Sequence, residues 1–187
     1  RDHYDSRKSI VMMIPIDLRN YFPSDTVRNF VHFIRVSIKP RPEYILDDYI
    51  RMTTEQFKEK ITAQNVKEMI KTTVRTEKSA ILKIFPLFLK IALTKFFRLF
   101  FKSRQTIIFS NVGKVSLNDS CGIDFVSMSL NASKYSTINL ATTTTNGKAI
   151  FTFTRSIMEN AIPNKVFNML NSFGCELTKL EFYNKEA

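Results

Sequence analysis

The sequence predicts an α/β fold, a two-layer sandwich in which helices pack on a mixed β-sheet. Three observations lead to this fold class: two apolar, β-branched runs near the N-terminus, a middle third with helical periodicity, and a β-rich last third that contains a hairpin signal. A chain of 187 residues is long enough to bury one core. We therefore expect a single domain that spans residues 1–187.

Two strands are expected in the first forty residues. Residues 9–16 (SIVMMIPI) form a short apolar run typical of a buried strand, with Pro15 at an edge or a strand end because it cannot donate to a ladder. Residues 17–23 form a turn. Residues 30–38 (FVHFIRVSI) predict a second strand, in which His32 and Ile34 share one face.

Helices follow from residue 43 to residue 74. Apolar residues recur there near a period of 3.6, with acidic residues early and lysines late, as the helix dipole prefers. Thr62 is the expected N-cap of a second helix that carries Val66, Ile70 and Val74.

The last third predicts strands at 106–110, 123–130, 137–145 and 148–155. Asn146-Gly147, between the last two, is the strongest hairpin signal in the chain. An amphipathic helix is expected at residues 164–173, where Gly174 ends it, and a last strand at 177–182.

The net charge of +11 is concentrated in the first part of the chain, where residues 1–105 hold 21 Lys/Arg against 11 Asp/Glu. A basic segment, residues 78–104, has seven basic residues and no acidic one, and Pro86 either kinks its helix or marks a first helical turn. We weigh a helix docked on the sheet with its lysines outward against a membrane-surface helix and a site for an anionic partner. A membrane span is disfavoured, because each central cation costs about 2.5–3.5 kcal/mol. No zinc spacing or nucleic-acid motif accompanies the charge, so we expect no nucleic-acid partner.

Few residues point to chemistry. Cys121 and Cys175 are not at metal-ligand spacing, and buried free thiols in a reducing cytoplasm are the expected state. No metal site is predicted. His3 is interpreted as a tail residue and His32 as a half-buried sheet histidine rather than a catalytic base. The sequence therefore predicts no catalytic residue in this chain, and a cytoplasmic location, since no signal peptide is visible.

Two short stretches allow both a structural and a functional interpretation. Asp17 and Arg19 flank Leu18 at a strand end, where they would form a local ion pair or a turn clamp, or where the arginine would brace an active-site channel. Residues 110–113 (SNVG) lead a strand into a turn. Their alternative role is to place a polar group against a substrate.

Taken in order, these landmarks resemble the C-terminal lobe of the chloramphenicol-acetyltransferase-like acyltransferases, in the alcohol-acetyltransferase or condensation-domain-like branch. The matching pieces span nearly the whole chain: IPIDLR at 14–19, RNF at 28–30, IFPLFLK at 84–90, the run from Thr106 through SNVGKV at 110–115, and FTFT at 151–154.

The resemblance implies a two-lobed enzyme with a substrate tunnel between the lobes. A His-His-x-x-x-Asp-Gly motif in the N-terminal lobe supplies the base, the co-substrate is acetyl-CoA or another acyl-CoA, and the acceptor is a small alcohol or amine. Arg19, Ser110 and Asn111 become substrate-tunnel candidates, and Asp17, Asn29 and Gly113 structural residues.

The chain has no His-His pair, and Val126-Ser127 follows Asp124-Phe125 where plant relatives have Asp-Phe-Gly-Trp-Gly. The resemblance therefore implies a lobe that needs a missing N-terminal lobe, or one that has lost catalysis. The alternative function is a noncatalytic binding or scaffold module that uses the basic segment to contact an anionic partner or a membrane surface.

Overall fold

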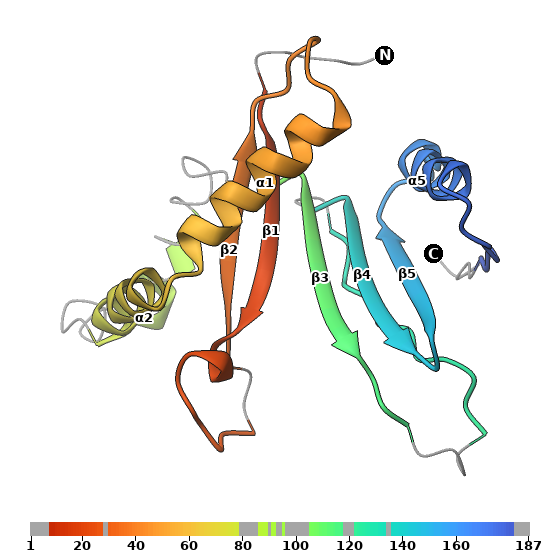
Figure 1. The fold of residues 1–187 in the computed structure, drawn as a ribbon. Helices are drawn as coiled ribbons and strands as arrows, with labels where there is room; N and C mark the ends of the chain where they lie inside the picture. The colour runs from red at the N-terminus through yellow and green to blue at the C-terminus, as the bar shows by residue number, and fades with distance from the viewer. Residues whose placement is uncertain are drawn as a thin grey trace.

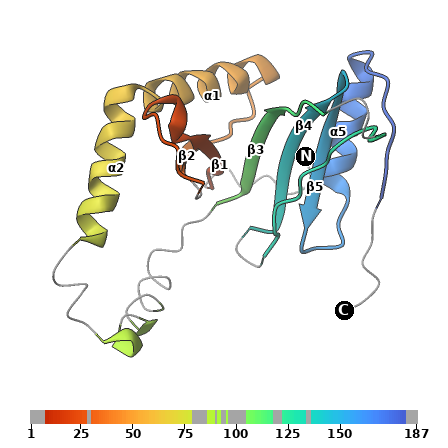
Figure 2. The same cartoon turned by 90° about the horizontal axis from the view of Figure 1, so that it is seen from below.

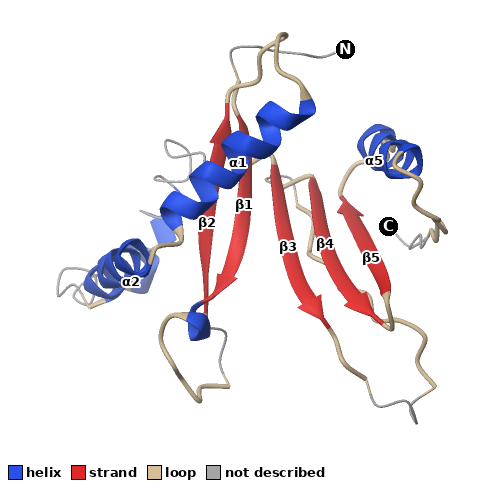
Figure 3. Ribbon diagram, viewed as in Figure 1, coloured by secondary structure: helices blue, strands red, loops and turns tan. Residues whose placement is uncertain are grey.

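The computed structural model describes residues 8–27, 30–78, 86–89, 91–92, 95, 105–117, 122–133 and 136–181. In chain order, the elements are β1 (Ile10–Asp17), η1 (Leu18–Asn20), β2 (Val31–Ile38), α1 (Leu46–Lys60), α2 (Ala63–Glu77), β3 (Ile107–Lys114), β4 (Ile138–Thr145), β5 (Lys148–Arg155) and α5 (Ala161–Ser172). The expected α/β fold class is confirmed, with the strands in one sheet and the helices outside it (Figure 3).

The five strands form a mixed sheet in the order β2-β1-β3-β4-β5 (Figure 1). The outer pairs β1–β2 and β4–β5 are antiparallel, whereas β1–β3 and β3–β4 are parallel. The β4–β5 hairpin turns at Asn146-Gly147, both of which have positive φ, 50° and 75°. This geometry is what a two-residue hairpin turn requires, and it confirms the hairpin prediction.

Helix α1 covers one face of the β1–β2 pair, as the view along the sheet shows (Figure 2). The core beneath it is formed by Ile34, Val36 and Ile38, of which Ile34 is fully buried. Alternate residues of β1 and one apolar side of α1 pack against these three: Met12, Ile14, Ile16, Tyr49, Met52, Phe57 and Ile61. The core is therefore built from the apolar residues that the strand alternation and the helical periodicity place on one face of each element.

The same helix occupies the outer edge of β2. The side-chain amide of Gln56 accepts a hydrogen bond from the Ser37 N–H at 3.1 Å and donates one to the Ser37 carbonyl at 2.9 Å. Lys60 donates to the Arg35 carbonyl at 2.5 Å. Exposed strand edges template pairing with other chains, so these three bonds protect the β2 edge.

The β1–β3 ladder is short, and its length follows from Pro15. Only Met12 and Met13 of β1 pair with β3, after which the two strands part toward their carboxyl ends (Figure 1). The Val11 carbonyl accepts from the Thr106 N–H and the Val11 N–H donates to the Thr106 hydroxyl, so the odd-numbered residues of β1 direct their backbone groups toward β3. Pro15 is the next odd residue after Met13 and has no N–H to donate. Pro15 was expected at an edge or a strand end; it lies within the interior strand β1, but its β3 side is unpaired, so it meets the expectation only on that side.

The face of β3 and β4 opposite α1 is covered by residues 122–133, which were predicted to contain a strand at 123–130. That prediction was wrong, because the segment lies over a face of the sheet and not beside an edge strand, so its backbone does not join the ladder. The segment is held instead by side chains of β4: Thr143 donates to the Val126 carbonyl at 2.5 Å, and Asn139 donates to the Asn131 carbonyl at 2.9 Å.

The remaining expectations have mixed outcomes. The cap at Thr62 is confirmed, since its hydroxyl accepts from the Asn65 N–H at 3.3 Å. Helix α5 begins three residues earlier than predicted and ends before Gly174, which has a φ of 79°. Residues 177–181 form no strand, and residue 182 lies outside the described part. Cys175 is free but exposed, because it follows the end of α5, while Cys121 is outside the described residues.

Most of the basic segment lies outside the described residues. Pro86 stands just before helical residues 87–89, and residues 81–85, which would distinguish a kink from a first helical turn, lie outside the described residues. Leu87 and Phe88 are 71% and 73% exposed, and these two residues therefore do not show the expected docking on the sheet. Among the described residues, no helix is long and apolar enough to cross a membrane.

Candidate functional site

The carboxyl ends of two neighbouring parallel strands, β1 and β3, lie at the same end of the sheet (Figure 1). After β1 the chain continues to β2 on one side, and after β3 it continues to β4 on the other side. In open α/β sheets, ligands bind where neighbouring strands part in this way, beyond their carboxyl ends. This switch point is the candidate functional site.

On the β1 side, Asp17 and Arg19 form the local clamp that the sequence predicts. The Asp17 carboxylate accepts from the Arg19 backbone N–H at 3.0 Å and from the Arg19 guanidinium at 3.2 Å. The other end of the guanidinium donates to the Thr26 carbonyl at 2.7 Å. The two side chains are 45% and 36% exposed. The clamp ties the loop after η1 to the end of β1.

On the β3 side, Ser110 faces away from α1. It pairs with Ala141 in the sheet, on the same side as Asn139 and Thr143. Ser110 is 8% exposed, and its hydroxyl has no hydrogen-bond partner within the described part of the chain. The Ser110 hydroxyl is not among the fully buried polar atoms without a partner, so water reaches it, and it is available to donate a hydrogen bond to a bound polar group.

Asn111 points to the other face and begins a β-bulge. The register passes from Asn111–Thr142 to Gly113–Thr143, so Val112 is the extra residue, and Gly113 has a φ of 80°. The Asn111 Oδ1 accepts from the Gly113 N–H at 2.9 Å and from the Thr142 hydroxyl at 3.1 Å. Both partners donate, so the atom that faces them has to be the oxygen of the amide.

Asp17 and Arg19 thus lie at the carboxyl end of β1, whereas Ser110 lies in the middle of β3, two residues beyond the last β1–β3 pair, and Asn111 lies on the α1 side. Gly113 supplies the left-handed residue that the bulge needs. Asn29 is outside the described residues. Thr142 was missed, because only the β3–β4 register shows that it lies opposite Asn111.

We call the side of the β1–β2 pair opposite α1 the free face; Val11 is buried on this side, but the two residues of β2 that follow are not. Phe33 is 46% exposed there, and Arg35 is exposed beside it. Met13 and Pro15 of β1 stand opposite these residues in the register. The β1–β2 pair is antiparallel, and an antiparallel pair commonly leaves one face to solvent or to a partner. The free face and Ser110 are on the same side of the sheet.

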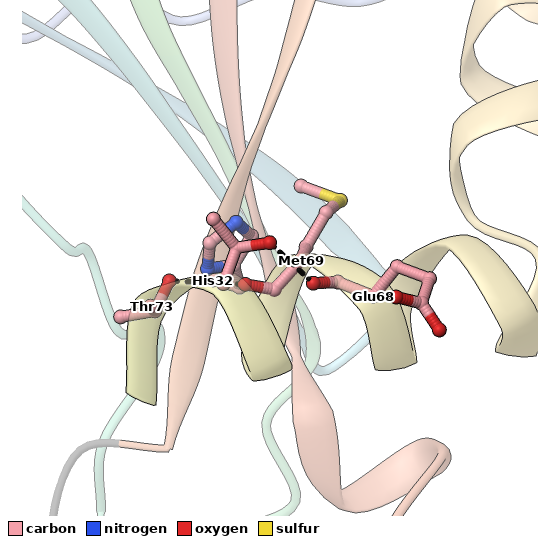
Figure 4. Close-up of a pocket in the computed structure, with 5 residues that line it drawn as sticks. His32, Glu68, Met69 and Thr73 are labelled. Carbon is pink, nitrogen blue, oxygen red and sulfur yellow. Dashed lines mark hydrogen bonds between the residues drawn. The ribbon is translucent and has the colours of Figure 1, made fainter. Parts of the chain in front are cut away.

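His32 lines a separate, open hollow of about 390 Å³ between β2 and α2, with Glu68, Met69, Thr72 and Thr73 (Figure 4). The hydroxyls of Thr72 and Thr73 donate to carbonyls of their own helix, at 2.9 and 3.1 Å. Glu68 directs its carboxylate away from His32 and pairs with Lys71 at 2.7 Å. His32 is half-buried, as predicted, and no carboxylate among the described residues orients it as a catalytic base.

No protein-family model matches the sequence, and no curated protein matches it. Among solved structures, the chain is similar to the epimerization domain from the third module of tyrocidine synthetase B, with a TM-score of 0.50 and 14% identity. The match covers 88% of this chain but only 36% of that domain. The epimerization domain has the condensation-type, chloramphenicol-acetyltransferase-like fold, so this likeness supports a fold of that type for the chain.

Proposed function

We propose that this chain is the C-terminal lobe of a two-lobed acyltransferase that moves an acyl group from a thioester, acetyl-CoA or another acyl-CoA, to an alcohol or amine. The observation that carries the proposal is the Ser110 hydroxyl, which has no hydrogen bond within the described residues and lies on β3 where β1 and β3 part, on the same side of the sheet as the free face. The chain corresponds to about a third of its structural neighbour, which is consistent with one lobe of a larger protein.

In this proposal the missing N-terminal lobe packs on the free face and brings a histidine. The histidine removes the proton from the acceptor hydroxyl or amine, whose oxygen or nitrogen attacks the thioester carbonyl. The carbonyl oxygen becomes negatively charged, and the Ser110 hydroxyl donates a hydrogen bond to it. When the tetrahedral intermediate collapses, the carbon–sulfur bond breaks and the CoA thiolate takes up the proton. The clamp of Asp17 and Arg19 holds the loop that borders this site.

Acyl transfer releases free CoA, which a thiol reagent detects. The isolated chain is expected to release no CoA from acetyl-CoA in the presence of alcohols or amines. The same chain joined to an N-terminal lobe that carries His-His-x-x-x-Asp-Gly is expected to release it. Robust transfer by the isolated chain, or none by a folded joined protein, would contradict the proposal. Epimerization, the activity for which the structural neighbour is named, would yield no free CoA and is therefore distinguished by the same assay.

A second candidate function rests on the basic segment, where Leu87 and Phe88 are exposed in a stretch without acidic residues. Apolar side chains combined with lysines are typical of a helix that lies on an anionic membrane surface. Co-sedimentation with vesicles of phosphatidylserine and phosphatidylcholine tests this function. Binding should disappear when Lys83, Lys90 and Lys95 are changed to Glu, and wild-type protein that stays in the supernatant would rule out a membrane-surface role.

A further inference from the structure

Asn111 is exposed, but its side-chain oxygen is engaged by two groups of the protein itself. Its Oδ1 accepts two hydrogen bonds, one from the Gly113 N–H within the bulge and one from the Thr142 hydroxyl on the adjacent strand. Ser110, the residue before it, faces the opposite side of the sheet. We propose, on the premise of the function above, that Asn111 and Thr142 are positioning residues that hold Ser110 toward the site, and that Asn111 makes no contact with substrate.

The Thr142 bond fixes the register of β3. Asn111 and Thr142 are direct partners in the β3–β4 ladder, so their side-chain bond joins the two strands at the residue next to Ser110. A slip of β3 by one residue would turn every side chain of the strand to the other face, and Ser110 would then point toward the α1 side. The bond between Asn111 and Thr142 opposes this slip.

The Gly113 bond fixes the bulge that follows. One residue, Val112, is extra at this point, and an extra residue invites the ladder to realign by shifting. An Asn or Asp side chain that accepts from the N–H two residues ahead closes a local turn and stabilises that geometry. Together, the two bonds hold β3 in the register that turns Ser110 to the side of the free face.

Substitutions distinguish a positioning role of Asn111 from a substrate contact, because its side-chain oxygen accepts both hydrogen bonds whereas its NH₂ group takes no part in them. In Asn111→Asp a carboxylate oxygen still accepts from Gly113 and Thr142, but the NH₂ group is lost. In Asn111→Ala the accepting oxygen and the NH₂ group are both lost. Thr142→Val removes only the hydroxyl and Thr142→Ser restores it. Thr144→Val, two residues along β4, is the matched control, since no hydrogen bond of its hydroxyl is found within the described residues.

The first measurement is amide hydrogen exchange in the isolated chain, which needs no ligand. The Gly113 N–H should exchange at least about tenfold faster in Asn111→Ala, the factor that corresponds to the loss of one hydrogen bond. Asn111→Asp and Thr144→Val should exchange as the wild type does, and Thr142→Val should fall between them. Unchanged protection of Gly113 in Asn111→Ala would overturn the proposed bulge bond.

The second measurement is CoA release by the chain joined to a histidine-bearing lobe. Asn111→Ala should lower kcat about tenfold or more and leave the KM for acetyl-CoA nearly unchanged, whereas Asn111→Asp and Thr142→Ser should keep activity near wild type. A loss in Asn111→Asp as large as in Asn111→Ala would show that the NH₂ group binds substrate, and would overturn the inference. A joined wild-type protein that is inactive would refute the proposed function and, with it, the positioning role, while hydrogen exchange would still report on the two bonds.

Discussion

The amide of Gln56 is predicted to contribute measurably to stability, because it replaces a strand at the edge of β2. Its two bonds to Ser37, at 3.1 and 2.9 Å, are lost in Gln56→Ala. Each such bond contributes about 0.5–1.5 kcal/mol net, and water can reach the half-buried Ser37 backbone in the variant, so the free energy of unfolding should fall by about 1–2 kcal/mol. That change corresponds to a drop in Tm of about 2–8 °C for a chain of this size.

Thermal and urea unfolding of the isolated chain, followed by circular dichroism, measure this difference. Glu55→Ala is the matched control, since Glu55 is exposed on the same turn of α1 and should change the free energy of unfolding by less than about 0.5 kcal/mol. Gln56→Ala should also self-associate more at high concentration, because the β2 edge is uncovered. Equal stability of Gln56→Ala and Glu55→Ala would refute the assignment of Gln56 as the group that closes the edge.

Three further predictions concern the core, the hairpin and the clamp. Ile34→Ala empties the centre of the α1 core and should cost about 2–5 kcal/mol, whereas Ile50→Ala, 54% exposed on α1, should cost little; equal losses in urea unfolding would contradict the core assignment. Gly147→Ala places a Cβ at a φ of 75° and should lower stability by about 1–2 kcal/mol, so an unchanged Tm would disprove the turn geometry. Arg19→Gln should accelerate amide exchange in residues 21–26 with little change in global stability, and unaltered exchange there would show that the clamp does not hold the loop.

The parts of the fold that sequence predicts well are those decided by near neighbours. Asn146-Gly147 determines its hairpin locally through positive φ, and the period of α1 follows from which residues meet Ile34 and Val36. The segment at 123–130 has strand-like composition, but it lies over a face of the sheet, and its place relative to the sheet is a property of the whole topology. Local preference could not reveal that.

The candidate site likewise has features that the sequence predicts and features that depend on the fold as a whole. Strand alternation already implies that Ser110 and Asn111 face opposite sides, and the spacing of Asp17 and Arg19 already indicates their ion pair. The bulge at Val112 and the bond between Asn111 and Thr142 depend on the β3–β4 register, and these residues are 31 positions apart in the chain. The parting of β1 and β3 required the sheet order before Pro15 could explain it.

Acyl transfer at the switch point, with Ser110 as the group that this chain supplies, is the core of the proposed function. Its most direct test is the kcat for CoA release of Ser110→Ala in the chain joined to a histidine-bearing lobe, relative to wild type and to Ser127→Ala, an exposed serine of the segment over β4. Loss of one hydrogen-bond donor to a developing oxyanion lowers kcat by about 10²–10³-fold. We expect a loss of that size for Ser110→Ala and none for Ser127→Ala; a kcat unchanged by Ser110→Ala in a folded, active protein would contradict the proposed role of Ser110.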